Sequence, residues 1–243
     1  MALRTAAKFA ASGCVLKPLL INFFMDPANS FDFSIPLASG PDLGDRPHDG
    51  WFHSSTHPSL TEAELVAYLT VPQKRTAPTY VGRMSMLFGT LTHGVVRSAL
   101  NQMGVTVPVP PGPCPVCHLP RVGRPSCEEH AAIDPSTHSR GHLDGILKIG
   151  KGYDLKTIKM YGSYGLKDAP DMDLAYFMAT WPKYYAQAQD YMRLTGLREF
   201  IVLFMVLGNP WEFREYHIPY DSAYCLGIET RYKNALRQAG MKL

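Results

Sequence analysis

The spacing of the apolar residues changes several times along the chain, and each change predicts a different element. Residues 200–207 form a continuous apolar run, which is typical of a short strand buried on both faces. Residues 141–149 and 153–159 predict two strands joined by a turn at Gly150-Lys151-Gly152, and residues 213–218 predict a further strand. Together these segments indicate a sheet in the second half of the chain.

Four segments show helical periodicity, and three of them carry recognisable start or stop signals. Thr61 is expected to be an N-cap, with Glu64 as its partner in a capping box. Pro182 marks a break or a fresh start within the third segment, and Gly240 stops the last one. The four predicted helices span residues 62–69, 84–103, 173–195 and 222–239.

The order of these elements predicts an α/β fold, in which helices flank a mixed sheet. Residues 26–58 are rich in Pro, Gly, Asp and Ser without a sustained period, so residues 1–58 are predicted to be an irregular N-terminal arm. The rest of the chain, residues 59–243, is predicted to form one domain that carries an insert at 108–131.

The composition supports a packed core and says little about partners. The chain has 243 residues, of which 46% are hydrophobic and 11% aromatic, and this excludes global disorder. Its formal net charge of +3 is small beside the charge of many duplex-binding proteins. Any surface for nucleic acid must therefore be local.

No membrane segment is expected. Residues 13–24 are apolar enough to suggest a signal segment, but Lys17 and Pro18 interrupt them and no clear small-residue cleavage site follows. No run approaches the ~18 apolar residues that are needed to cross a bilayer. We therefore expect the protein to work in the cytoplasm.

Two aspartates and a lysine in the predicted hairpin could form a metal site. Asp154 and Lys156 share one face of their strand because they are two residues apart. A turn at 149–151 would pair Asp144 with Lys156 and place Asp154 diagonal to Asp144, roughly 7–8 Å away at Cα. Two carboxylates at that separation can bind one hard cation such as Mg²⁺. A solvated strand edge would give the same tripeptide, so this pattern alone decides little.

Further motifs accompany the tripeptide in a fixed order, and they span residues 82 to about 208. They are Gly89-x-x-x-His93, Gly141-x-x-Asp144, Asp154-x-Lys156-Thr157 and Gln187-x-x-x-Tyr191. In this order and on these elements, they resemble the RecB-type exonucleases of the PD-(D/E)XK superfamily, which have a restriction-endonuclease-like core. Each motif is weak alone, but four in the right order are fairly specific.

The resemblance implies a metal-dependent deoxyribonuclease. Asp144, Asp154 and Lys156 would be its catalytic residues. His93 and the backbone carbonyl of Leu155 would join the two aspartates in binding Mg²⁺ or Mn²⁺. In the absence of the other motifs, His93 would instead be a satisfied histidine on a half-buried helix.

The resemblance also assigns supporting roles. Gln187 and Tyr191 lie four residues apart on one helix face and would contact the DNA backbone or brace the active site. Gly89 would let its helix approach the sheet closely. Ordinary packing at the helix surface and core edge would explain Gln187 and Tyr191 as well.

The resemblance leaves three functions open. The first is an exonuclease on DNA that prepares ends for recombination or replication. It would be encoded by a phage and act in the cytoplasm of its bacterial host, with a recombination or replication protein as a candidate partner. The second is a structure-specific or restriction-type endonuclease. The third is a non-catalytic module that binds DNA or a protein, although the intact set of two aspartates and a lysine argues against it. The oligomeric state stays open.

A cysteine cluster in the insert predicts a second metal site. Two close-spaced pairs in a segment rich in Pro and Gly can complete a tetrahedral zinc site, and the metal would hold this loop-rich knuckle together. His118 is a rival for the fourth position. The predicted zinc ligands are Cys114, Cys117, Cys127 and His130.

An iron–sulfur cluster is not expected. In the superfamily members that hold one, a single cysteine precedes the nuclease motifs and three follow them. Here the cluster of cysteines stands between the histidine motif and the aspartate motif, and this position favours zinc. Cys14 and Cys225 are predicted to be plain thiols.

Overall fold

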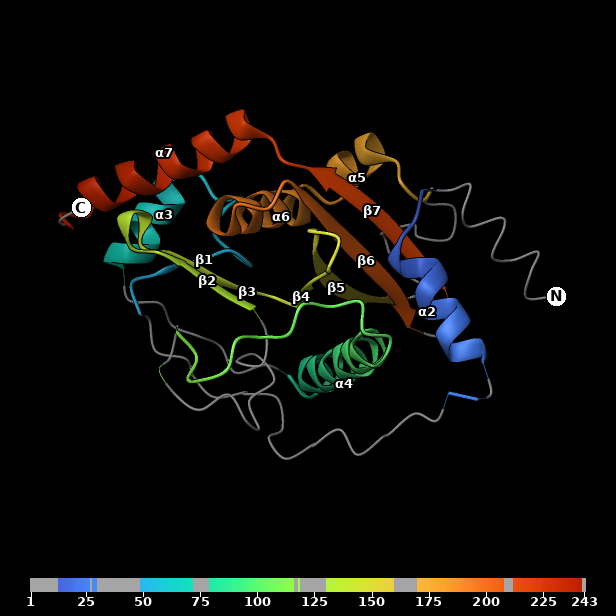
Figure 1. Ribbon diagram of the computed structural model, residues 1–243. Helices are drawn as coiled ribbons and strands as arrows, with labels where there is room; N and C mark the ends of the chain where they lie inside the picture. The colour runs from blue at the N-terminus through green and yellow to red at the C-terminus, as the bar shows by residue number, and fades with distance from the viewer. Residues whose placement is uncertain are drawn as a thin grey trace.

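Four strands from the second half of the chain form the central sheet, in the order β4-β5-β6-β7, in a computed structural model of the protein (Figure 1). The structure describes residues 13–26, 28–29, 49–71, 79–115, 118, 130–159, 170–207 and 212–241. The strands are β4 (Gly145–Ile146), β5 (Gly152–Lys159), β6 (Glu199–Leu207) and β7 (Phe213–Pro219). The central pair, β5 and β6, is parallel, whereas β4 and β7 pair antiparallel with their neighbours. The predicted mixed sheet is therefore confirmed.

A second, smaller sheet has the order β1-β3-β2. It consists of β1 (Phe52–His53), β2 (His130–Asp134) and β3 (Ser139–Leu143), and the 3₁₀ turn η2 (Pro135–Thr137) links β2 to β3. The sequence did not predict β1 or β2. With two residues, β1 is too short to show a periodicity, and β2 directly follows the segment that was expected to be a metal-bound loop.

The predicted strand at 141–149 is divided between the two sheets, which corrects the sequence interpretation. β3 ends at Leu143 and β4 begins at Gly145, with a bend at Asp144 between them. Leu143 pairs with His130 in the small sheet, while Gly145 pairs with Tyr153 in the central sheet. A pattern of apolar residues cannot show this division, because both halves remain extended.

The predicted helices all form, with ends that differ by a few residues. They are α3 (Glu62–Thr70), α4 (Tyr80–Gln102), α5 (Leu174–Thr180), α6 (Pro182–Thr195) and α7 (Ser222–Gln238). The capping box of Thr61 and Glu64 is present. Pro182 begins α6, as expected, because the missing N–H of proline costs nothing in the first turn of a helix.

A further helix, α2 (Leu16–Met25), lies in the segment that was expected to be irregular. Pro18 stands in its first turn, where it does not break the helix. The carboxylate of Glu215 on β7 accepts the N–H groups of Val15 and Lys17, at 2.6 and 2.7 Å. This partner is about two hundred residues away in the sequence, so no local signal could reveal the cap.

The two faces of β6 explain its continuous apolar run. Phe200, Val202 and Phe204 pack with aromatic side chains of α5 and α6 on one face. Ile201 and Leu203 pack with α2 and α4 on the other face, so helices cover the sheet on both sides (Figure 1). The rings between residues 176 and 191 thus mostly fill the core. None of the helices in the described part of the chain has the length and apolar character needed to cross a membrane.

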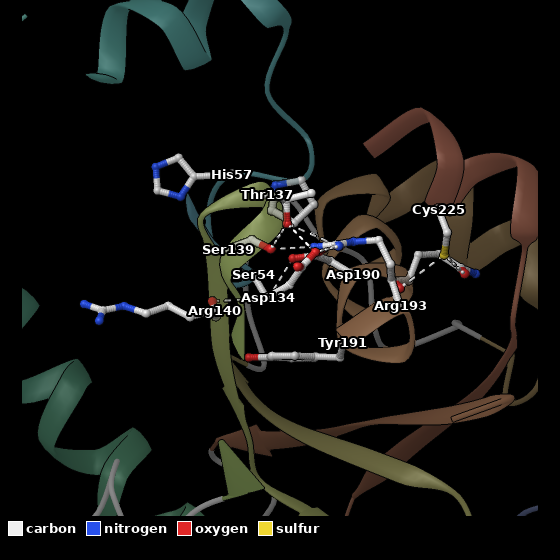
Figure 2. Close-up of polar contacts among 12 residues, drawn as sticks. Ser54, His57, Asp134, Thr137, Ser139, Arg140, Asp190, Tyr191, Arg193 and Cys225 are labelled. Carbon is white, nitrogen blue, oxygen red and sulfur yellow. Dashed lines mark hydrogen bonds and ion pairs between the residues drawn. The ribbon is translucent and has the colours of Figure 1, made fainter. Parts of the chain in front are cut away.

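A buried ion-pair network fastens α6 to the small sheet, and Figure 2 shows its side chains. Arg193 on α6 contacts Asp190 Oδ1 at 2.8 Å and Asp134 Oδ2 at 2.9 Å, and it donates to Ser139 Oγ at 2.6 Å. Ser54 Oγ donates to Asp190 Oδ2 at 2.7 Å. Asp190 is fully buried, and burial raises its pKa despite the adjacent guanidinium of Arg193.

We expect Arg193→Met to lower the free energy of unfolding by about 3–5 kcal/mol, because it leaves the charge of Asp190 buried without its cation. The loss should be smaller at pH 5 than at pH 7. Without Arg193, the pKa of Asp190 in the folded variant should be raised further. The folded variant then binds a proton that the unfolded chain does not bind, so its stability falls as the pH rises from 5 to 7. Urea unfolding at the two pH values measures both effects.

Arg237→Met is the matched control, because Arg237 is exposed on α7 and donates only to Asn234 within its own helix among the bonds recorded for it. It should leave the unfolding midpoint almost unchanged. Equal losses in the two variants would contradict a special role for the Arg193 network.

Candidate active site

Asp154 and Lys156 lie on the same face of β5, as predicted from their spacing. They pair with Val202 and Phe204 of β6, whose side chains face α6, while Leu155 faces the opposite core. Lys156 Nζ lies 2.5 Å from Asp154 Oδ2. The lysine and the carboxylate therefore form an ion pair on the α6 side of the central sheet.

Asp144 reaches this pair from the bend between the two sheets. Its Oδ2 accepts the backbone N–H of Leu155 at 2.6 Å, and its Oδ1 lies 3.3 Å from His93 Nδ1 on α4. In the pairing of β4 with β5, Leu155 would face the carbonyl of Leu143 if the strand continued. The carboxylate of Asp144 takes the place of that carbonyl.

The predicted pairing of Asp144 with Lys156 is wrong by two residues. The turn covers residues 148–150, since Leu147 N–H donates to the carbonyl of Lys151 at 2.8 Å. Gly145 pairs with Tyr153, and this register points Asp144 towards Asp154. A shift of two residues keeps the parity of a strand, so the acidic groups still converge.

The charges of the four side chains are strongly coupled. Asp144 and Asp154 are each only 6% exposed. Burial and the nearby charge of Asp144 raise the pKa of Asp154 to about 6, despite the ion pair with Lys156. Burial alone would also raise the pKa of Asp144, but His93 and the Leu155 N–H lower it below its usual value. The site thus holds one firmly ionised carboxylate beside one that is easily protonated.

Burial and the nearby carboxylates also act on the pKa values of the two basic groups, His93 and Lys156. Burial alone would lower the pKa of His93, but the carboxylate of Asp144 raises it above its usual value. Burial would likewise lower the pKa of Lys156, and Asp154 and Asp144 raise it instead. Lys156 is therefore a fixed positive charge at neutral pH.

The backbone N–H of Leu155 points towards Asp144. The N–H and C=O groups of one strand residue project from the same edge of the strand. Since the N–H of Leu155 binds Asp144, its carbonyl lies on that same edge and not on the β6 side. The carbonyl that was predicted to bind metal is thus on the strand edge that faces Asp144.

Gly89 stands where α4 crosses the central sheet. A Cβ atom at this position would lie 3.3 Å from Thr157 Oγ1, which is tight. The absence of a side chain lets α4 come close to β5, as expected, and so brings His93 to Asp144.

Gln187 and Tyr191 are buried on α6 and contact the strand before Asp144. Gln187 Nε2 donates to the Tyr191 hydroxyl at 3.0 Å, and that hydroxyl donates to the carbonyl of His142 at 2.7 Å. Figure 2 shows the Tyr191 side chain extending from α6 towards β3. This geometry suits the bracing role more than a contact with DNA.

The carboxylates suit Mg²⁺ or Mn²⁺ better than a metal that needs a closed cage. Among the residues that the structure describes, no three His, Cys, Asp or Glu side chains already converge as a metal site. The Asp144 and Asp154 side chains contact His93 and Lys156 instead. Mg²⁺ keeps several waters and is bound by one or two carboxylates, so two adjacent buried carboxylates fit it.

The zinc ligands are only partly described. Cys117 and Cys127 lie outside the described residues. Cys114 is buried with its Sγ 3.4 Å from His142 Nε2, whereas His130 Nε2 lies 3.1 Å from the carbonyl of Val107. His130 and His142 are on opposite faces of the small sheet, because His142 pairs with Ala131. The zinc knuckle therefore stays a prediction.

Sequence reasoning did not single out Tyr184, which the structure brings to the site. Lys156 Nζ lies 5.0 Å from the centroid of its ring. The available signal was the position of Tyr184 three residues before Gln187, which places both on one face of α6.

Comparisons with known proteins give structural similarities at low identity. No protein-family model matches the chain, and no curated protein matches it. An alkaline exonuclease (LHK-Exo) from Laribacter hongkongensis is 16% identical, with 79% of this chain and 88% of that chain covered and a TM-score of 0.47. For LHK-Exo in complex with dAMP, the identity is 16%, the coverage 79% and 89%, and the TM-score 0.48.

We expect Gly141→Ala to be destabilising by about 1–3 kcal/mol through overpacking. A Cβ atom on Gly141 would lie 2.6 Å from the ring of Tyr191 and 2.7 Å from Ser54 Oγ. The ring would have to move away from β3 and would lose its bond to His142. Chemical unfolding measures the loss.

Gly227→Ala on α7 is the matched control, because its Cβ would meet nothing closer than 3.6 Å. Alanine favours a helix over glycine by up to about 1 kcal/mol, so this variant should be as stable as the parent or more so. If both variants are stable, the close contact between Gly141 and Tyr191 is not a constraint.

Proposed function

We propose that the protein is a metal-dependent deoxyribonuclease that hydrolyses phosphodiester bonds at Asp144, Asp154 and Lys156. One observation carries this proposal: two carboxylates are buried side by side at a sheet edge, with a lysine on the same strand face as one of them. Burying two like charges is costly, and a bound cation would offset that cost. A purely structural role would be served by apolar side chains at lower cost.

The cation would be Mg²⁺ or Mn²⁺, held by Asp144, Asp154 and the carbonyl of Leu155, with His93 beside them. When bound, such an ion makes water more acidic and neutralises charge on the phosphate. Asp144 is well suited to bind first, since its low pKa keeps it ionised. The Leu155 N–H fixes one of its oxygens, so the carboxylate has little freedom to turn away.

Lys156 would act on the attacking water and on the phosphate. Its ammonium is positive at neutral pH, and strand β5 holds it beside Asp154. A positive charge placed in advance where negative charge develops stabilises the transition state. The lysine therefore complements the cation from a second direction.

The preferred substrate in this proposal is linear DNA, attacked from an end. The division between exonuclease and endonuclease depends on how the DNA is held, and the same carboxylates and lysine would serve both. Digestion of circular and of end-labelled linear DNA separates the two modes: loss of label from one end supports an exonuclease, and nicking of circles supports an endonuclease.

We expect cleavage only with a divalent cation, and three variants to differ in a defined way. Asp154→Ala should abolish cleavage, because it removes a metal ligand. Lys156→Ala should lower the rate on the order of 10²–10³ and leave metal binding in place. His93→Ala should weaken metal affinity more mildly, so added Mn²⁺ should partly restore its rate. Cleavage of linear DNA and calorimetric metal titrations measure these effects.

Lys233→Ala on α7 is the control for the loss of a lysine, since Lys233 pairs only with Glu229 within its helix among the ion pairs recorded for it. It should cleave at the parent rate. Parent rates in both Asp154→Ala and Lys156→Ala would overturn the proposed function and would favour a non-catalytic binding module.

Metal binding should release protons below neutral pH. With a pKa of about 6, Asp154 is half protonated at pH 6 in the metal-free protein. A cation needs the carboxylate form, so binding should displace roughly 0.5 proton from this group at pH 6 and about 0.1 at pH 7. Affinity should accordingly weaken as the pH falls through 6.

Isothermal titration with Mn²⁺ in two buffers of different ionisation enthalpy counts these protons. The Asp154→Asn variant should lose the share that Asp154 contributes. The same heat in both buffers at pH 6 would show that no proton leaves, and Asp154 would then not be a metal ligand.

A further inference from the structure

Lys156 has a second partner besides Asp154, and it is an aromatic ring. Its Nζ atom lies over the ring of Tyr184, 5.0 Å from the centroid, while Asp154 Oδ2 lies 2.5 Å away. The face of an aromatic ring carries negative potential and attracts an ammonium within about 6 Å. The ammonium of Lys156 is thus held from two directions.

The ring of Tyr184 is itself held in place by the core. It is half-buried on α6, and its centroid lies 5.7 Å from the ring of Phe204. Phe204 pairs with Lys156 across β5 and β6, so the two strands present the lysine and the supporting ring side by side. Tyr184 shares its helix face with Gln187 and Tyr191, which brace the strand before Asp144.

The two partners of Lys156 differ once a cation is present. The negative charge of Asp154 would then be shared with the cation, which also repels the ammonium. The ring of Tyr184 is neutral and keeps its attraction for the ammonium. A lysine without that ring would gain freedom to turn away from the site.

We propose that Tyr184 is a positioning residue for Lys156, whose ring face holds the ammonium at the active site when Asp154 binds metal. This inference rests on the proposed nuclease function. The ring and not the hydroxyl carries the effect, because the ammonium lies over the ring face. Tyr184→Phe should therefore behave like the parent, and Tyr184→Leu should not.

The first test is spectroscopic and needs no activity. Protein labelled with ¹³C at the lysine Cε atoms gives one signal for Lys156, identified by its loss in Lys156→Arg. Protons above a ring face are shifted upfield, so this signal should be displaced in the parent and in Tyr184→Phe. It should return to the position of an ordinary lysine in Tyr184→Leu. Adding Ca²⁺ as the cation should leave the Lys156 signal displaced, because the neutral ring keeps its attraction for the ammonium.

The second test is kinetic. Tyr184→Leu should lower kcat for linear DNA roughly 2- to 30-fold, which is the range of a cation–π contact, with KM for DNA little changed. Tyr184→Phe should restore kcat to the parent value. A role of the ring in stability alone would lower the melting temperature of Tyr184→Leu without this split between kcat and KM.

Tyr220→Leu is the matched control, since the guanidinium of Arg198 lies 4.7 Å from the Tyr220 ring centroid in a similar contact. It removes a cation–π pair outside the proposed site and should leave kcat unchanged. Any loss of stability common to both leucine variants is thereby separated from the effect on Lys156.

The outcomes separate the inference from the proposed function. If the parent protein does not cleave DNA, the nuclease proposal is overturned. The NMR signal of Lys156 would still decide whether its ammonium lies over the ring of Tyr184. Active parent protein with a full rate in Tyr184→Leu would overturn the inference alone. A loss in Tyr184→Phe equal to that in Tyr184→Leu would overturn it as well, because the hydroxyl would then carry the effect.

Discussion

The structure depends on one hydrogen bond, in which the carboxylate of Asp144 accepts the N–H of Leu155. At this point the chain leaves the small sheet and enters the central sheet, so a ladder bond between backbones is not available. The side chain supplies the missing acceptor, and this fixes where β3 ends and β4 begins. The same bond holds a carboxylate next to Asp154. The junction of the two sheets and the proposed site are therefore one feature, and neither can be changed alone.

Two buried carboxylates would repel each other, and the surrounding elements limit that repulsion in different ways. His93 on α4 approaches Asp144 from one side of the sheet, and Lys156 on β5 approaches Asp154 on the other. The raised pKa of Asp154 shows that this compensation is incomplete in the protein alone. A cation between the carboxylates would complete it. Under the proposed function, this remaining electrostatic cost would favour the binding of a cation.

Features with local causes could be predicted from the sequence, and features with distant causes could not. The capping box at Thr61 and the start of α6 at Pro182 depend on neighbouring residues, and both were predicted. The shared face of Asp154 and Lys156 follows from strand geometry alone. By contrast, α2 depends on Glu215, which follows it by about two hundred residues. The register around Asp144 depends on a turn whose position the flanking glycines leave open, and so the pairing was predicted two residues away.

Helix α6 connects the two sheets, because its side chains contact both of them. One face carries Gln187 and Tyr191, which hold β3 just before Asp144. The residue three positions earlier on that face, Tyr184, contacts Lys156 on β5. Near its C-terminal end, Arg193 fastens the helix to the small sheet through buried ion pairs. A displacement of α6 would therefore move the support of β3 and β5, the two strands beside the proposed site, together. Asp144 and Lys156 come from different strands, and α6 contacts the strand before Asp144 through Tyr191 and Lys156 itself through Tyr184, in addition to the bond between Asp144 and Leu155.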